Sequence, residues 1–141
     1  MSQDREINRR ALLSGACALL ALTGLGTLPV SASEGILKLS NGRVSVKLKS
    51  IPELSSVGGS VGIGDVKGKP VAITRTGNSS YVAFSLSCPH QKVTVSREGN
   101  GWVCDAHGSE FEADGALVLG PATKRLTRVP IKVSRGVATI G

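Results

Sequence analysis

The chain has 141 residues, of which 40% are hydrophobic and 19% are charged, and its formal net charge is +7. This length fits one ordinary domain, and the hydrophobic content excludes wholesale disorder. Only 3% of the residues are aromatic whereas 18 are glycine, so the composition favours turns over long helices. With two histidines and three cysteines, the chain cannot be a His-rich metal store or a multi-disulfide scaffold.

Residues 1–32 have the layout of an export signal. A polar start that ends in Arg9-Arg10 precedes the uncharged residues 11–30, and Val30-Ser31-Ala32 resembles a cleavage site. We therefore predict a twin-arginine-like signal in residues 1–32 and a periplasmic location for the rest of the chain. The alternative is an N-terminal anchor in the inner membrane, because the uncharged stretch is long enough to span a bilayer.

Cleavage after Ala32 would leave a domain, residues 33–141, that is still basic, with a net charge of +6. Cys17 would leave with the signal. The cysteines and histidines that remain are Cys88, His90, Cys104 and His107.

From residue 37 onward, short alternating apolar runs are separated by Gly, Asn, Asp, Pro and Ser, which indicates strands joined by turns. Beyond the signal, no helical period is sustained for three turns, and no repeat stands out. The sequence therefore predicts an all-β fold. The predicted strands are residues 43–49, 60–66, 70–76, 80–86, 92–98, 101–104, 116–120, 128–133 and 136–140.

The metal-capable residues form two short motifs. Cys88-Pro89-His90 is followed, after thirteen residues, by Cys104-Asp105-Ala106-His107. The motifs stand at the two ends of a predicted hairpin with arms 92–98 and 101–104, and a hairpin brings its ends together. Two thiolates and two imidazoles facing one spot indicate a metal centre.

Three interpretations of this centre remain open from the residues alone. Cys88 and Cys104 could form a disulfide in an oxidising compartment. Two Cys and two His also suit a tetrahedral structural zinc site. The third interpretation is an iron–sulfur cluster, which the flanking sequence favours.

The stretch 88–131 resembles the Rieske iron–sulfur proteins over its full length. It contains Cys-x-His, a spacer, Cys-x-x-His-Gly-Ser at 104–109, then Asp114-Gly115 and Gly-Pro-Ala at 120–122. Including the preceding strands, the resemblance covers about residues 57–141 and leaves 33–56 unassigned. It implies a Rieske-like antiparallel β sandwich with a small cluster-binding subdomain at about residues 86–123.

The resemblance also implies a cofactor, one 2Fe-2S cluster. Cys88 and Cys104 would bind one iron, and His90 and His107 would bind the other. Neutral imidazoles in place of two thiolates make the cluster less negative, so such centres have potentials of about −150 to +300 mV. Because no nucleophile–base pair, paired acid or second metal site is evident, we expect an electron-transfer protein rather than a stand-alone enzyme.

Some positions depart from the quinol-oxidising Rieske proteins. Those proteins carry two further cysteines where this chain has Val93 and Ala106. Ser109 matches a serine that hydrogen-bonds a cluster sulfide in high-potential members, but Phe111 replaces their tyrosine. Gly120-Pro121 belongs to the loop that would hold the cluster region in place. Because hydrogen bonds to the sulfurs stabilise the reduced state, we predict an intermediate potential.

We expect an exported carrier that is the small subunit or soluble partner of a periplasmic redox complex, similar to the small subunit of molybdenum-containing arsenite oxidases. The alternative is the Rieske subunit of a cytochrome bc-type quinol-oxidising complex, and a structural zinc-binding module is the competitor from another class. The expected partner is a redox protein: a cytochrome, or a molybdenum or cytochrome b subunit.

Lys124, Arg125 and Arg128 are either a docking site for an acidic partner or a solvated strand face. We do not expect nucleic-acid binding, because aromatic residues do not interleave with the basic ones.

Overall fold

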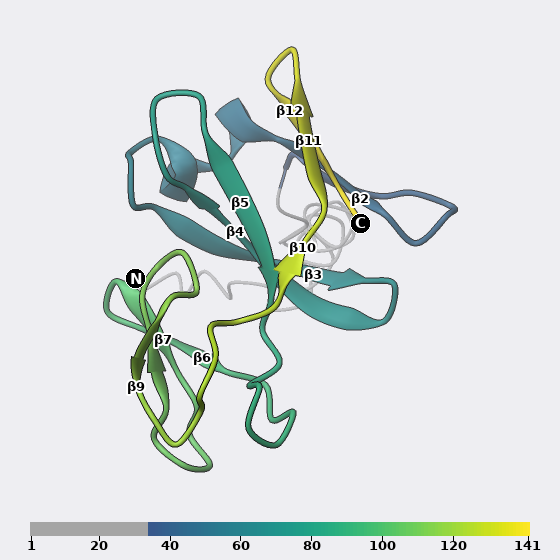
Figure 1. Ribbon diagram of the computed structural model, residues 1–141. Helices are drawn as coiled ribbons and strands as arrows, with labels where there is room; N and C mark the ends of the chain where they lie inside the picture. Colours follow the sequence, from purple (N-terminus) through teal and green to yellow (C-terminus); the bar gives the residue numbers. More distant parts are fainter. Residues whose placement is uncertain (1–33) are drawn as a thin grey trace, which may run out of the picture. The chain divides into compact units, whose positions relative to one another are not determined.

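The computed structural model describes residues 34–141, which form antiparallel β-sheets and two single-turn 3-10 helices (Figure 1). The predicted all-β fold is therefore confirmed. Within this range, no helix is long and apolar enough to cross a membrane. The predicted signal or anchor, residues 1–32, lies outside the described residues.

The elements are β1 (Ile36–Lys38), β2 (Val44–Lys47), η1 (Leu48–Ser50), η2 (Pro52–Leu54), β3 (Ser60–Val66), β4 (Lys69–Arg75), β5 (Tyr81–Ser85), β6 (Ser96–Glu98), β7 (Gly101–Val103), β8 (Glu110–Phe111), β9 (Leu117–Leu119), β10 (Arg128–Val129), β11 (Ile131–Ser134) and β12 (Val137–Ile140).

The first sheet has the strand order β1-β2-β12-β11 and joins the two ends of the described chain. Val44 of β2 lies opposite Ile140 of β12, and both side chains are fully buried. The segment 33–56, which the family resemblance left unassigned, contains β1, β2, η1 and η2. This segment therefore contributes half of the first sheet.

The second sheet has the order β10-β5-β4-β3 and shares one apolar core with the first. The predicted strand 128–133 is wrong as a single element. It divides at Pro130 into β10, which pairs with β5, and β11, which pairs with β12. Proline has no backbone N–H and so cannot continue a ladder through a sheet.

The third sheet has the order β6-β7-β8-β9 and lies at the lower left in Figure 1. The predicted hairpin is present, with β6 and β7 as its arms, but the first arm begins at Ser96 rather than at residue 92. The two-residue strand β8 was not predicted. The third sheet falls within the range of about 86–123 expected for a subdomain, and the limits of that subdomain stay a prediction.

Contacts at Ala113 and Gly115 attach the third sheet to the second. The Ala113 carbonyl accepts hydrogen bonds from Thr74 Oγ1 (2.5 Å) and Trp102 Nε1 (3.3 Å). Gly115 has a φ of +81°, and a Cβ there would lie 3.1 Å from Leu126 Cβ and 3.2 Å from the Phe84 ring. Glycine is required at this junction because a side chain would meet both a strained backbone and packed neighbours.

Candidate metal centre

The first loop, residues 88–93, follows β5 and is closed by two backbone hydrogen bonds of Cys88. The Cys88 N–H donates to the Val93 carbonyl, and the Lys92 N–H donates to the Cys88 carbonyl, both at 2.8 Å. Lys92 has a φ of +63°, a conformation that glycine adopts more readily than lysine. The loop therefore presents Cys88 at the start of a tight turn.

The second loop, residues 104–109, joins β7 to β8 and repeats this closure residue for residue. The Cys104 N–H donates to the Ser109 carbonyl, and the Gly108 N–H donates to the Cys104 carbonyl, again at 2.8 Å. Gly108 has a φ of +77° at the place that Lys92 occupies in the first loop. Two loops at the ends of one hairpin thus have the same backbone hydrogen bonds.

The loops direct their sulfur and nitrogen groups differently. Cys88 and Cys104 are both fully buried in the core beneath the third sheet, and both are free thiols, so the structure contains no disulfide between them. His90 and His107 are exposed, and their ring centroids lie 4.8 Å apart with the planes at 87°. The structure therefore brings the two predicted imidazoles together at the surface, whereas the thiols of the same two loops are buried.

This donor set fits a cluster with two different iron environments. A metal-bound imidazole nitrogen lies about 2 Å from its metal, so rings with centroids 4.8 Å apart can both reach one ion. A 2Fe-2S cluster of mixed ligation needs two thiolates on one iron and two imidazoles on the other. Within residues 34–141, no three or more His, Cys, Asp or Glu side chains converge as a site for a single ion.

Ser109 is fully buried behind the second loop, where its Oγ accepts a hydrogen bond from the Ala122 N–H at 3.0 Å. Because this bond uses a lone pair, the hydroxyl proton stays available to another acceptor. The bond also ties the loop that contains Gly120-Pro121 to the second loop. Sequence reasoning did not identify the Ala122 amide, since a backbone donor leaves no signal in a side-chain pattern.

Phe111 lies in β8 opposite Trp102 of β7 and is 2% exposed. Trp102 packs edge-on against Phe84, with ring centroids 6.0 Å apart, and both belong to the core beneath the third sheet. Phe111 therefore fills the core close to Cys104, but its ring has no hydroxyl to donate to a sulfur.

Asp114 forms ion pairs with two of the three basic residues that the sequence analysis considered as a docking site. Its Oδ2 lies 3.1 Å from Arg125 Nη2 and 3.5 Å from Arg128 Nη2. Partial burial acts to raise the pKa of the Asp114 carboxyl, but the Ala116 N–H hydrogen bond and the two guanidinium groups outweigh burial and hold this pKa below its usual value. The charges of Arg125 and Arg128 are thus partly compensated by Asp114 within the domain.

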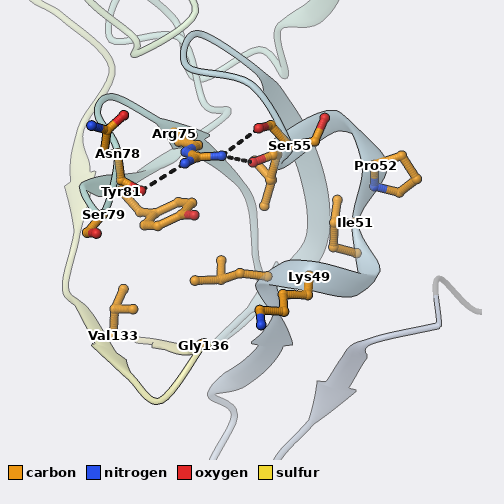
Figure 2. A pocket seen from close by; sticks show the side chains of 12 residues that line it. Lys49, Ile51, Pro52, Ser55, Arg75, Asn78, Ser79, Tyr81, Val133 and Gly136 are labelled. Carbon is orange, nitrogen blue, oxygen red and sulfur yellow. Dashed lines mark hydrogen bonds between the residues drawn. The ribbon is translucent and has the colours of Figure 1, made fainter.

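A separate hollow of ≈ 560 Å³ lies away from the two loops (Figure 2). The Arg75 guanidinium crosses its wall and donates hydrogen bonds to backbone carbonyls on both sides, including Ser55 at 2.5 Å and Asn78 at 2.8 Å. Tyr81 lies near the same guanidinium, with its ring centroid 6.0 Å away. Arg75 is therefore used to hold η2 against the turn after β4.

Comparison with known families identifies the arrangement. The family model described as the Rieske 2Fe-2S domain matches residues 46–131. Among solved structures, the chain is similar to the plasma membrane Rieske protein PetC3 of the cyanobacterium Synechocystis PCC 6803. Their identity is 29%, over 59% of this chain and 86% of that chain, with a TM-score of 0.50.

Two further similarities support the fold alone, because their identities are low. A chain of a hyperthermophilic respiratory complex III is 17% identical over 92% of this chain and 93% of that chain, with a TM-score of 0.56. A chain of the complex of reduced oxygenase and oxidized ferredoxin in carbazole 1,9a-dioxygenase is 20% identical over 72% and 94%, with a TM-score of 0.51. No curated protein matches the chain.

Proposed function

The chain belongs to the Rieske 2Fe-2S domain family, and from that premise we propose that it is an exported one-electron carrier of a periplasmic redox complex. Membership of the family makes it a Rieske electron carrier whose cofactor is one 2Fe-2S cluster of the Rieske type. The finer proposal is that it serves as a small subunit or soluble partner, as in arsenite oxidases.

We assign the cluster ligands to the two loops: Cys88 and Cys104 on one iron, His90 and His107 on the other. The observation that carries this assignment is the pairing of two exposed rings, 4.8 Å apart, with two buried free thiols. When bound, the cluster accepts and releases one electron. The exposed imidazoles place one side of the site where a partner can approach, and the buried thiols keep the other side dry.

The environment of the loops supports an intermediate potential. Ser109 is buried with its hydroxyl proton unused by its hydrogen bond to Ala122, which leaves a donor for the cluster region. Phe111 offers no second donor, and Val93 and Ala106 cannot form the disulfide of the quinol-oxidising proteins. Fewer hydrogen bonds to sulfur favour the oxidised state, so the potential should lie below that of the high-potential class.

Metal analysis and EPR of the reduced protein test the ligand assignment. We expect about two irons and two sulfides per chain, and the EPR signal of a mixed-ligand cluster. Cys88→Ala and Cys104→Ala should each abolish that signal. Cys17→Ala is the matched control, because this cysteine lies outside the domain, and it should leave the signal intact. A colourless protein with one zinc would support the structural zinc-binding module instead.

Cell fractionation tests the location and separates the two kinds of complex. We expect the chain in the periplasm, and we expect Arg9→Lys with Arg10→Lys to retain it in the cytoplasm. The second candidate, a subunit of a cytochrome bc-type complex, is favoured by the fold it shares with a chain of respiratory complex III. Tight retention of the full-length chain in the inner membrane through residues 11–30 would support that candidate.

A further inference from the structure

A groove of ≈ 690 Å³ runs beside the first loop, along the ends of β4 and β5 and past β10. Its floor includes the buried side chains of Val66 and Val71. Ser87 and Lys92, which flank Cys88 and His90, form part of its wall. The groove therefore lies directly against the segment that we assign to the cluster.

The groove is positively charged. Among the described residues, Lys67, Lys69, Lys92 and Arg128 line it, whereas no aspartate or glutamate of residues 34–141 does. Within residues 34–141, the three lysines make no ion pair, whereas Arg128 lies 3.5 Å from Asp114. Hydroxyl groups of Ser87, Thr94 and Thr127 add polar groups to the same lining.

The backbone holds two of these lysines in an unfavourable conformation. Lys67 has a φ of +49° and Lys92 a φ of +63°, and they are two of only three non-glycine residues with positive φ in the described part of the chain. A lysine in this region costs about 1 kcal/mol relative to glycine, and asparagine is tolerated better. The strain is consistent with a use for the two charges at these positions.

The walls of the groove are held by backbone hydrogen bonds between neighbouring segments. The Leu86 N–H donates to the Pro70 carbonyl and the Ser85 N–H to the Thr127 carbonyl, both at 2.8 Å. A groove that is already formed loses little conformational freedom when it binds a partner.

We propose that this groove binds an extended acidic segment of the protein that exchanges electrons with the cluster; the proposal rests on the carrier function proposed above. The basic rim would pair with carboxylates, and Val129 and Pro130, which are not buried, would contact small apolar side chains between them. With a volume of ≈ 690 Å³ the groove is larger than a single small anion needs, and none of the described residues that line it is aromatic, so no base could stack there. The docking charge is thus on Lys67, Lys69 and Lys92 rather than on Arg125.

The test uses the cluster-loaded protein and a fluorescent peptide of alternating glutamate and valine, measured by anisotropy at low salt. We expect one peptide to bind per chain and a combined Lys67→Asn, Lys69→Gln and Lys92→Asn variant to weaken binding at least tenfold. Asparagine accommodates the positive φ, so the backbone of the variant is kept. The matched control is Lys49→Gln, Lys124→Gln and Lys132→Gln, which removes the same charge outside the groove and should bind nearly as well as the parent.

Three outcomes overturn the proposal. Equal weakening by both triple variants would mean that net charge alone attracts the peptide. A second peptide, with glutamine in place of each glutamate, tests apolar contact, and equal binding of this peptide would mean that apolar contact alone is sufficient. Inorganic phosphate that binds the groove with the same lysine dependence and displaces the peptide would make it a small-anion site. The EPR signal recorded on the same samples keeps the two proposals separate, because an intact signal leaves the carrier function standing when peptide binding fails.

Discussion

The first and second loops have the same backbone closure but opposite surroundings. Each begins with a cysteine whose N–H and carbonyl are both used within the loop. The position with positive φ is Lys92 in the first loop and Gly108 in the second, and the last residue is Val93, 37% exposed, against fully buried Ser109. The second loop is thus supported by the core, whereas the first loop carries a charge into the groove.

Under the two proposals made above, this difference implies a division of roles between the loops. The buried hydroxyl and the relaxed glycine of the second loop suit a fixed setting for the cluster. The exposed valine and strained lysine of the first loop suit contact with another protein. Each role makes its loop sensitive to a different substitution.

The largest contrast is expected at the last loop position. Ser109→Ala leaves the Ala122 N–H without its partner in a buried place, which should cost about 1–3 kcal/mol of unfolding free energy. Val93 at the equivalent position is 37% exposed, so Val93→Ala should cost less than about 1 kcal/mol. Urea unfolding of the loaded protein, followed by the fluorescence of Trp102, the single tryptophan, measures both. Equal costs would contradict the proposed difference in support.

The next contrast is at the position with positive φ, where substitutions in the two loops should change the unfolding free energy in opposite directions. Gly108→Ala should lower the unfolding free energy by about 1 kcal/mol, because alanine is strained at +77°. Lys92→Gly should raise it by less than about 1 kcal/mol, since the relief of strain is partly offset by the entropy of glycine in the unfolded chain. The same urea titration distinguishes them, and a loss of stability in Lys92→Gly would show that the lysine stabilises its loop.

Redox titration tests the effect of hydrogen bonding behind the second loop, because one variant adds a hydroxyl there and another removes one. Phe111→Tyr adds a hydroxyl near Cys104 and should raise the midpoint potential, whereas Ser109→Ala should lower it. A differential hydrogen-bond energy of about 1 kcal/mol corresponds to about 40 mV for one electron. Val93→Ala serves as the reference and should leave the midpoint unchanged. A fall in Phe111→Tyr, or a parent midpoint at the top of the family range, would refute the intermediate potential.

The smallest effect is expected at Asp114, which ties the segment after the Gly120-Pro121 loop to the third sheet. Its folded pKa lies below the unfolded value, so its stabilisation is present above about pH 4 and is lost as pH falls through the folded pKa. Asp114→Asn should destabilise the protein at pH 7 by less than about 1 kcal/mol, because the ion pairs are partly exposed. The difference between parent and variant should shrink toward pH 2. A difference that does not change with pH would exclude the charge of Asp114 as its cause.

Much of the candidate site followed from local sequence. The spacing of Cys88-Pro89-His90 and Cys104-Asp105-Ala106-His107 predicted a metal centre at the ends of a hairpin, and the structure brings the histidine rings together. The alternation of apolar residues predicted most strands of the second sheet. The split at Pro130 was missed, because an alternating run continues on both sides of the proline and only the pairing reveals two different sheets.

The sequence alone determined the all-β fold class and the family, and it showed the two Cys/His motifs, because these depend on residue types at short spacings. Only the tertiary structure revealed that β2 pairs with β12, that Ser109 is held by the Ala122 amide, and that Arg125 and Arg128 are occupied by Asp114. The tertiary structure also places Lys67, Lys69 and Lys92 in the lining of one groove. These features join residues far apart in the chain, and contacts of that range are decided by the packing of the whole domain rather than by any local pattern.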